Sequence, residues 1–240
     1  KFTNLMGYTF VGWSLVQNSP TAEYTTESVI ELTENITLFA VWRANEYKIT
    51  FESGNANIDF ATLEVEGKTL ENNSGMFTFN TELPTITATA NGYVIHSWYY
   101  IDSQGFERTW VFGGDNPNRV IASENKDGEM VPFTLYARWG ITVNFEKFSV
   151  IANDDEFNQN ADLYDSVIVP VGDAIPFVHT QGTASLGSAL HVRPQIPGYS
   201  FVGWYTDNEG AQEFDINQAF TIDFINSLKA NSTDTAVTIY

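Results

Sequence analysis

Two segments of the chain alternate apolar and polar residues, which is the pattern of a strand that buries one face. They span residues 47–51 and 141–145. The apolar positions are Tyr47, Ile49 and Phe51 in the first segment and Ile141, Val143 and Phe145 in the second. We therefore expect a half-buried strand at each place, with these side chains directed into a core.

Two other apolar segments, residues 37–42 and 134–139, end in tryptophan. They read Thr37-Leu38-Phe39-Ala40-Val41-Trp42 and Thr134-Leu135-Tyr136-Ala137-Arg138-Trp139, and the start of the same pattern returns in Thr238-Ile239-Tyr240. A period of two places Leu135, Ala137 and Trp139 on one face of a strand. The small alanine beside the large ring leaves room for a facing side chain. We expect both segments to be strands.

Helical spacing is found at one place. Phe220, Phe224 and Leu228 recur at this spacing beside Ile225, which predicts a helix over residues 221–230. Two further apolar runs read as additional strands, residues 63–66 and 167–171. The apolar residues are mostly β-branched or aromatic, and such residues favour strands. The predicted fold class is therefore β-dominated, of the α+β type.

A glycine–aromatic signature occurs three times in the chain. The copies are Gly7-Tyr8-Thr9-Phe10-Val11-Gly12-Trp13, Gly92-Tyr93-Val94-Ile95-His96-Ser97-Trp98-Tyr99 and Gly198-Tyr199-Ser200-Phe201-Val202-Gly203-Trp204-Tyr205. Together with the opening and closing segments they define a repeat. We predict the C-terminal part of a truncated repeat (1–44), a complete repeat (45–139) and a nearly complete repeat (140–240), cut before its final strand ends. Because Gly140 alone links the last two repeats, we expect a semi-rigid string of units.

The signature is expected to contain a β-bulge. Period two alone would send Trp13 to the face opposite Tyr8, and a glycine in a strand often marks a bulge that turns the chain. Gly12 and Gly203 stand at the required position. The middle copy has Ser97 there, which leaves the bulge open for that repeat.

These segments resemble the Listeria–Bacteroides repeat family, which includes internalin-type B-repeats and modules of many large bacterial surface proteins. The resemblance rests on Gly-Tyr-x-Phe-x-Gly-Trp-Tyr followed by Thr-Leu-Tyr-Ala-x-Trp, and it spans essentially the whole chain. The middle copy departs from it with Ile95 and Ser97. The resemblance implies tandem β-grasp, ubiquitin-like modules in an elongated arrangement, with long loop insertions around residues 55–82 and 153–183. It brings no catalytic residues.

Charge and composition limit the classes of molecule that the chain is expected to bind. Thirty acidic residues against 11 basic ones give a net charge of −19, which disfavours binding to nucleic acid and to anionic membrane surfaces. No apolar run approaches the ~20 residues that span a bilayer, so we expect no membrane insertion by this segment. The chain has no cysteine, which excludes disulfides and thiolate chemistry.

No catalytic motif is present. The chain lacks a Gly-x-Ser-x-Gly elbow, a Walker loop, a His-Glu-x-x-His motif and a dinucleotide fingerprint. The three histidines, His96, His179 and His191, are far apart in the sequence. Acidic residues abound, but no pair stands out as the two carboxylates of a glycosidase. We expect no enzyme activity.

One acidic loop is a candidate calcium site. Its carboxylates are Asp154, Asp155, Glu156, Asp162 and Asp165. Calcium takes six to eight oxygen ligands, which such a loop could supply. The spacing lacks the glycine and the terminal glutamate of an EF-hand, and a solvated acidic loop is the alternative that we favour. No other cofactor is expected.

An aromatic group in the middle repeat is a candidate ligand site. Trp110 and Phe112 have no counterparts in the other copies, and they accompany Tyr99 and Tyr100. Flat rings of this kind can stack on sugars. We expect the framework tryptophans to be core. Trp110 is a better candidate than these for an exposed contact, although a core position is the reading that we favour for it as well.

The family resemblance implies a stalk or spacer in an extracellular bacterial protein, at the cell surface or secreted, whose partners are the neighbouring repeats of the same chain. An adhesive module that binds a host protein or a glycan through the loop insertions is the alternative. An accessory domain of a larger hydrolase is a third hypothesis.

Overall fold

The computed structural model describes residues 5–122, 131, 133–146, 163–175 and 197–240. Strands dominate the described residues, and they form several sheets beside one α-helix, as the composition predicts. The elements are β1 (Tyr8–Ser14), β2 (Phe39–Ala44), β3 (Glu46–Glu52), β4 (Thr62–Val65), β5 (Lys68–Thr69), η1 (Glu71–Asn73), β6 (Ser74–Thr78), β7 (Ile86–Thr89), β8 (Val94–Ile101), β9 (Glu107–Trp110), β10 (Phe133–Glu146), β11 (Leu163–Pro170), α3 (Ile222–Leu228) and β12 (Ala236–Ile239).

The chain forms two compact units, each assembled from separate segments. Unit 1 contains residues 1–51, 65–86 and 110–135, and unit 2 contains residues 52–64, 87–109 and 136–240. The limits of the units fall inside several strands, among them β10. The repeat boundaries at residues 44 and 139 are inferred from the repeated sequence motifs and do not coincide with the limits of the units. They stay a prediction.

Unit 1 contains two antiparallel strand pairs. Strand β1 pairs with β2, and β3 pairs with β6. The alternation predicted for the opening strand is confirmed, because Tyr47, Ile49 and Phe51 are each 1% exposed. Phe77 and Phe79 meet this face edge-on, at 6.3 Å from Phe51 and 6.1 Å from Tyr47. Aromatic rings therefore form the core beneath β3.

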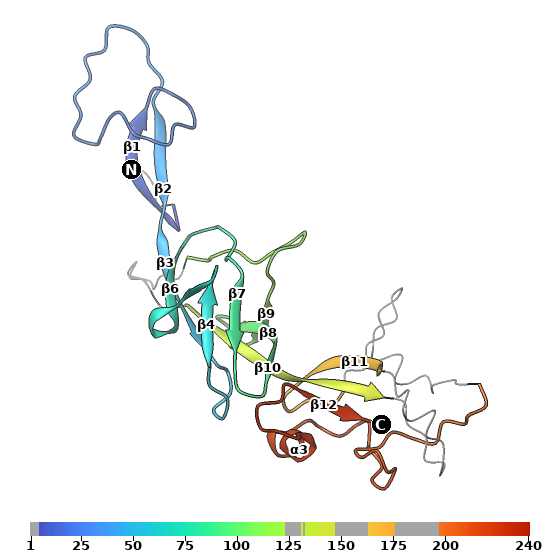
Figure 1. Cartoon of the computed structure of the whole chain (residues 1–240). Helices are drawn as coiled ribbons and strands as arrows, with labels where there is room; N and C mark the ends of the chain where they lie inside the picture. The colour runs from blue at the N-terminus through green and yellow to red at the C-terminus, as the bar shows by residue number, and fades with distance from the viewer. Residues whose placement is uncertain (1–4, 123–130, 132, 147–162, 176–196) are drawn as a thin grey trace. The chain divides into compact units, whose positions relative to one another are not determined.

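Unit 2 is built around strand β10. Figure 1 shows β10 as one long arrow with β11 and β12 beside it. Strands β8 and β11 pair with β10 in the antiparallel sense, and β12 pairs with it in the parallel sense. The buried core unites side chains from all of these segments: Ile141, Val143, Phe145, Val169, Ile175, Trp204, Phe214, Phe220, Ile225, Val237 and Ile239.

The predicted helix and strands are confirmed. Helix α3 lies within the predicted range, and the Thr221 side chain accepts the Phe224 backbone N–H at 3.2 Å, which is an ordinary N-terminal cap. Ile225 is fully buried on its inner face. Strands β4 and β11 cover most of the two additional apolar runs.

The link between the second and third repeats is an uninterrupted strand. Strand β10 has 14 residues and includes both Trp139 and Gly140. At Gly140 it pairs with Val94 on one edge and with Pro170 on the other. A Cβ atom at Gly140 would lie 2.8 Å from the carbonyl oxygen of Val169, so only glycine fits this paired position. The expected short link is therefore continuous β-structure.

Each signature segment pairs with the closing segment that follows it, and equivalent residues face each other in all three copies. The matching pairs are Trp13 with Ala40 and Ser14 with Phe39 in the first copy, Trp98 with Ala137 and Tyr99 with Tyr136 in the second, and Tyr205 with Tyr240 in the third. In the third copy, residues 201–204 form no regular strand.

The predicted bulge is confirmed in the first copy and also occurs in the second. The register shifts between Phe10 and Gly12, and it shifts again between Ile95 and Ser97. The bulge thus forms without glycine in the middle repeat, so it follows from the strand register. No ladder is described around Gly203, where the bulge stays a prediction.

The phenylalanine of the signature packs against its tryptophans. In the first copy, the Phe10 ring lies 5.3 Å from both Trp13 and Trp42, each in an edge-to-face arrangement. In the third copy, Phe201 lies 5.3 Å from Trp204 in the same way. Such contacts add roughly 0.5–1.5 kcal/mol beyond the burial of the rings.

The middle repeat replaces this phenylalanine from another part of the chain. Ile95 occupies the signature position, and Phe60 supplies the ring instead, at 6.0 Å from Trp98 and 5.7 Å from Trp139. Phe60 therefore occupies the role that Phe10 has in the first copy. This compensation explains how the repeat tolerates the departure at Ile95.

We predict that Phe60→Ala lowers the free energy of unfolding by about 2–4 kcal/mol, because it removes the ring between two buried tryptophans. Adding Ile95→Phe to that variant should recover part of the loss, whereas Ile95→Phe alone should not stabilise the chain. Urea denaturation followed by tryptophan fluorescence measures all three. Phe106, which is 58% exposed, provides the control Phe106→Ala. Equal losses for the two alanine variants would contradict the compensation.

Candidate functional site

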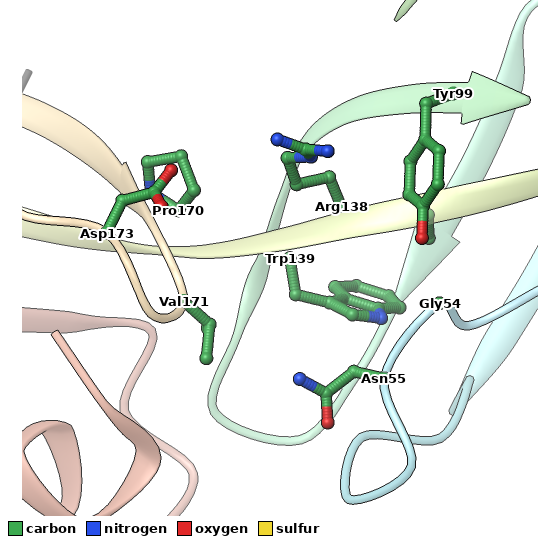
Figure 2. Close-up of a pocket in the computed structure, with 9 residues that line it drawn as sticks. Gly54, Asn55, Tyr99, Arg138, Trp139, Pro170, Val171 and Asp173 are labelled. Carbon is green, nitrogen blue, oxygen red and sulfur yellow. The ribbon is translucent and has the colours of Figure 1, made fainter. Parts of the chain in front are cut away.

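A small hollow in unit 2 is the candidate site. It has a volume of about 170 Å³ (Figure 2). It is lined by Gly54, Asn55, Tyr99, Ala137, Arg138, Trp139, Pro170, Val171 and Asp173. These residues come from four separate segments of the sequence and meet where β10 crosses the predicted boundary between the second and third repeats.

The hollow follows from the pairing of β10. On one edge, β8 covers residues 136–140. On the other edge, pairing with β11 ends at Gly140, and only the Val171 backbone N–H continues it, donating to the Trp139 carbonyl at 2.9 Å. A side chain at Gly54 would overlap the carbonyl of Ala137, so a glycine lets this loop approach the strand. The space between the loop and the β11 turn is the hollow.

Trp139 brings an unsatisfied donor to the hollow. It is 2% exposed, and its indole N–H has no hydrogen-bond partner among the described residues. Leaving such a donor unpaired in a buried place costs about 1–3 kcal/mol. The Asn55 side-chain oxygen already accepts the Asn57 backbone N–H at 2.9 Å. An acceptor on a bound molecule would therefore relieve the penalty at Trp139.

Arg138 and Tyr99 form the polar part of the lining. Figure 2 shows Arg138 and Trp139 on opposite sides of β10. The Arg138 guanidinium lies 5.0 Å above the Tyr99 ring and forms an ion pair with Glu107. Both ion-pair partners are partly exposed, so the pair contributes less than about 1 kcal/mol. Burial, followed by the charge of Glu107, raises the pKa of Tyr99, so its hydroxyl stays protonated and can donate.

His96 lies near this group and is the extra residue of the second bulge. Burial and the charge of Arg138 lower the pKa of His96, and Asp173 partly opposes this effect. Its imidazole is therefore neutral at neutral pH, and its Nδ1 is 3.1 Å from the Ser97 hydroxyl. The described residues that line the hollow include no second histidine, serine or cysteine beside it. His179 and His191 lie outside the described residues.

Of the two positions considered for Trp110, the structure has the core position and not the exposed one. Trp110 is 4% exposed, and its ring packs 5.6 Å from Phe133 and 6.5 Å from Phe112. Trp110 is the last residue of β9, and its side chain lies in the core of unit 1. The sequence did not reveal this, because Trp110 lies in an insertion that has no counterpart in the other copies. Tyr99 and Tyr100 are partly buried neighbours on β8, so they point to opposite faces of the sheet. The four predicted aromatics do not form one group.

The predicted calcium ligands are mostly beyond the described part of the chain. Asp154, Asp155, Glu156 and Asp162 lie outside it, and Asp165 is in β11, where its backbone pairs with Phe145. Within the described residues, no three histidine, aspartate or glutamate side chains lie close enough to hold a metal ion. The calcium site stays a prediction.

Two other aspartates have a structural role in turns. The Asp207 carboxylate accepts the backbone N–H groups of Glu209 and Ala211 at 2.9 and 3.0 Å, and these bonds lower its pKa. Asp102 accepts the N–H of Phe106 at 2.9 Å, which together with Arg108 lowers the pKa of that carboxyl. Both carboxylates close a turn after the signature tryptophan.

Comparison with known families identifies the repeated segments. Residues 4–41 and 181–226 match the Listeria-Bacteroides repeat domain. These two segments are similar to the Listeria-Bacteroides repeat domain. The resemblance inferred from the signature is thus confirmed over these two segments, which contain its first and third copies. The middle copy, with Ile95 and Ser97, lies outside both matched segments of the repeat domain.

Two relatives extend along most of the chain. A "Putative membrane protein" of Evansella cellulosilytica is 27% identical over 213 residues, which are 85% of this chain and 24% of the relative. A "Putative Gly-rich membrane protein" of the same organism is 25% identical over 202 residues, which are 84% of this chain and 18% of the relative. The chain therefore spans a quarter or less of the length of these relatives.

No solved structure matches the chain significantly. Among the helices of the described residues, none is long and apolar enough to cross a membrane.

Proposed function

We propose that this chain is a non-catalytic spacer, a run of Listeria-Bacteroides repeats in a protein exposed on the surface of a bacterium. The observation that carries the proposal is strand β10. Because the closing strand of one repeat and the opening strand of the next are one strand of 14 residues, no flexible linker separates them. The occurrence of the family in surface proteins and the names of the relatives support the location.

A second contact supports a stiff joint between the second and third repeats. The Lys229 ammonium donates to the Gly92 carbonyl and lies 4.2 Å from the centre of the Tyr93 ring. Gly92 has a φ of +76°, and a side chain there would overlap the Ser232 carbonyl. The signature Gly-Tyr of one repeat thus packs against the following repeat. Partly desolvated cation–π contacts of this kind contribute about 0.5–2 kcal/mol.

The same dipeptide makes the corresponding contact between the first and second repeats. The Tyr8 ring meets Phe79 edge-on at 5.2 Å, and the Asn45 backbone N–H donates to the Gly7 carbonyl at 2.9 Å. The recurrence of the contact at both joints gives the Gly-Tyr pair a role in joining repeats. It supports a spacer in which each repeat fixes its neighbour.

The third repeat also supports the β-grasp assignment that we propose for each repeat. Its order is a strand in β10, the antiparallel strand β11, helix α3 and the strand β12, which is parallel to β10. An opening hairpin, a helix and a final strand parallel to the first are the central features of a β-grasp fold.

Small-angle X-ray scattering tests the spacer directly. A compact protein of this length would have a radius of gyration of about 18 Å. We expect a clearly larger value for the purified chain, because a spacer extends its repeats. A variant with a short Gly/Ser insertion between Trp139 and Gly140 is the matched control, and its scattering should show added flexibility. A compact value for the unaltered chain would reject the spacer.

A second candidate function, adhesion to glycans, rests on the hollow beside Trp139. The lining of the hollow includes the polar side chains of Tyr99 and Asp173 together with the indole of Trp139. The net charge of −19 disfavours an anionic ligand, and Arg138 disfavours a cation. A neutral polyhydroxyl ligand such as a sugar ring fits this mixture of donors and acceptors best.

Binding to an array of glycans and matrix proteins, with calcium and with chelator, tests this second candidate. Trp139→Phe keeps an aromatic ring but removes the N–H, so it should weaken a specific interaction by roughly 2–12-fold, the value of one hydrogen bond. Trp110→Phe, a change at a buried tryptophan outside the hollow, should leave it unchanged. A blank array would reject adhesion, and an unaltered affinity in Trp139→Phe would exclude the hollow as its site.

A further inference from the structure

The first and last strands of the third repeat lie side by side and run in the same direction. Residues 142–145 of β10 pair with residues 236–239 of β12 in parallel register. The Thr142 backbone N–H extends this contact by donating to the Thr235 carbonyl at 3.0 Å. The two strands through which the chain enters and leaves the repeat are therefore bonded directly to each other.

Tension along the chain would load this pairing in shear. A pull from the second repeat enters through residue 140, at the N-terminal end of the paired segment of β10. The opposing force acts at residue 240, just beyond the C-terminal end of β12. Because parallel strands place these two points at opposite ends of the ladder, the strands are pulled past each other. All of the bonds then resist together, whereas strands pulled from the same end separate one bond at a time.

The ladder is protected from water on its core face. Val143 and Val237 are 0% and 4% exposed, and Phe145 and Ile239 are both fully buried. Ile225 of helix α3 belongs to the same core. Water cannot readily replace hydrogen bonds in such a place, and a buried group left unpaired is costly. The bonds must therefore break before solvent can compensate for them.

A further pair of bonds holds the end of the closing segment. The Tyr240 backbone N–H donates to the Tyr205 carbonyl at 2.8 Å, and the Tyr205 N–H donates to the Tyr240 carbonyl at 2.7 Å. The closing segment is thus fastened on both edges, to β10 and to the signature segment. These bonds add to the resistance at the point where tension leaves the repeat.

We infer that the pairing of β10 with β12 is a mechanical clamp, which makes the third repeat a load-bearing module. This inference rests on the proposed spacer function, in which tension passes from one repeat to the next. It adds a property that a spacer does not need, namely resistance to unfolding under force along the direction of the chain.

Single-molecule force spectroscopy with two attachment geometries tests the clamp. The chain has no cysteine, so introduced thiols are unique points of attachment. The shear geometry uses Thr134→Cys with a cysteine added after Tyr240. The peeling geometry uses Thr134→Cys with Thr233→Cys, an exposed position before β12. At equal pulling speed, we expect a severalfold higher unfolding force in the shear geometry.

Both variants should first show the same near-ultraviolet circular dichroism and urea midpoint as the unaltered chain, which establishes that both are folded. Equal unfolding forces in the two geometries, or the absence of a distinct unfolding event in shear, would overturn the clamp. A compact particle in solution scattering together with a high shear force would reject the spacer and leave the clamp intact. An extended particle together with equal forces in the two geometries would reject the clamp and leave the spacer intact.

Discussion

The continuity of strand β10 across the predicted boundary between two repeats is the constraint on which the rest of unit 2 depends. A strand has two hydrogen-bonding edges, and at Gly140 both are occupied, by Val94 of one repeat and Pro170 of the next. The junction can therefore hold no loop. Gly140 can also carry no side chain, because a Cβ atom there would lie 2.8 Å from the Val169 carbonyl oxygen. The fixed register that results also places the Ala137–Trp139 segment beside the Gly54 loop, which creates the hollow.

Local periodicity predicted the elements that depend on neighbouring residues. Alternation identified the strands that carry Ile49 and Val143, and helical spacing identified α3, because a buried face imposes its period on the sequence. The internal repeats added the register, since three copies of a signature are constrained in the same way. Glycine spacing does not predict the second bulge, because Ser97 stands at that position within the same register.

Features formed by distant segments were not predictable from one sequence. Phe60 precedes Trp98 by dozens of positions and belongs to a loop with no counterpart in the first copy. Trp110 has no counterpart either, so neither repetition nor periodicity distinguished a core position from an exposed one. The hollow combines residues from four segments, and the unpaired indole N–H of Trp139 becomes evident only when all four are in place.

The first and third copies share a local geometry but differ in burial. The Tyr24 N–H donates to the Trp13 carbonyl as the Phe214 N–H donates to that of Trp204, so Tyr24 and Phe214 occupy matching positions. Yet Tyr24 is only partly buried in the first copy, whereas Phe214 is 6% exposed in the third. Native-state hydrogen exchange through residues 138–142 tests the shared strand most directly. The account predicts amides across this junction that are as protected as those in the centre of β10, and exchange as fast as in an exposed loop would reveal a hinge at Gly140 and contradict it.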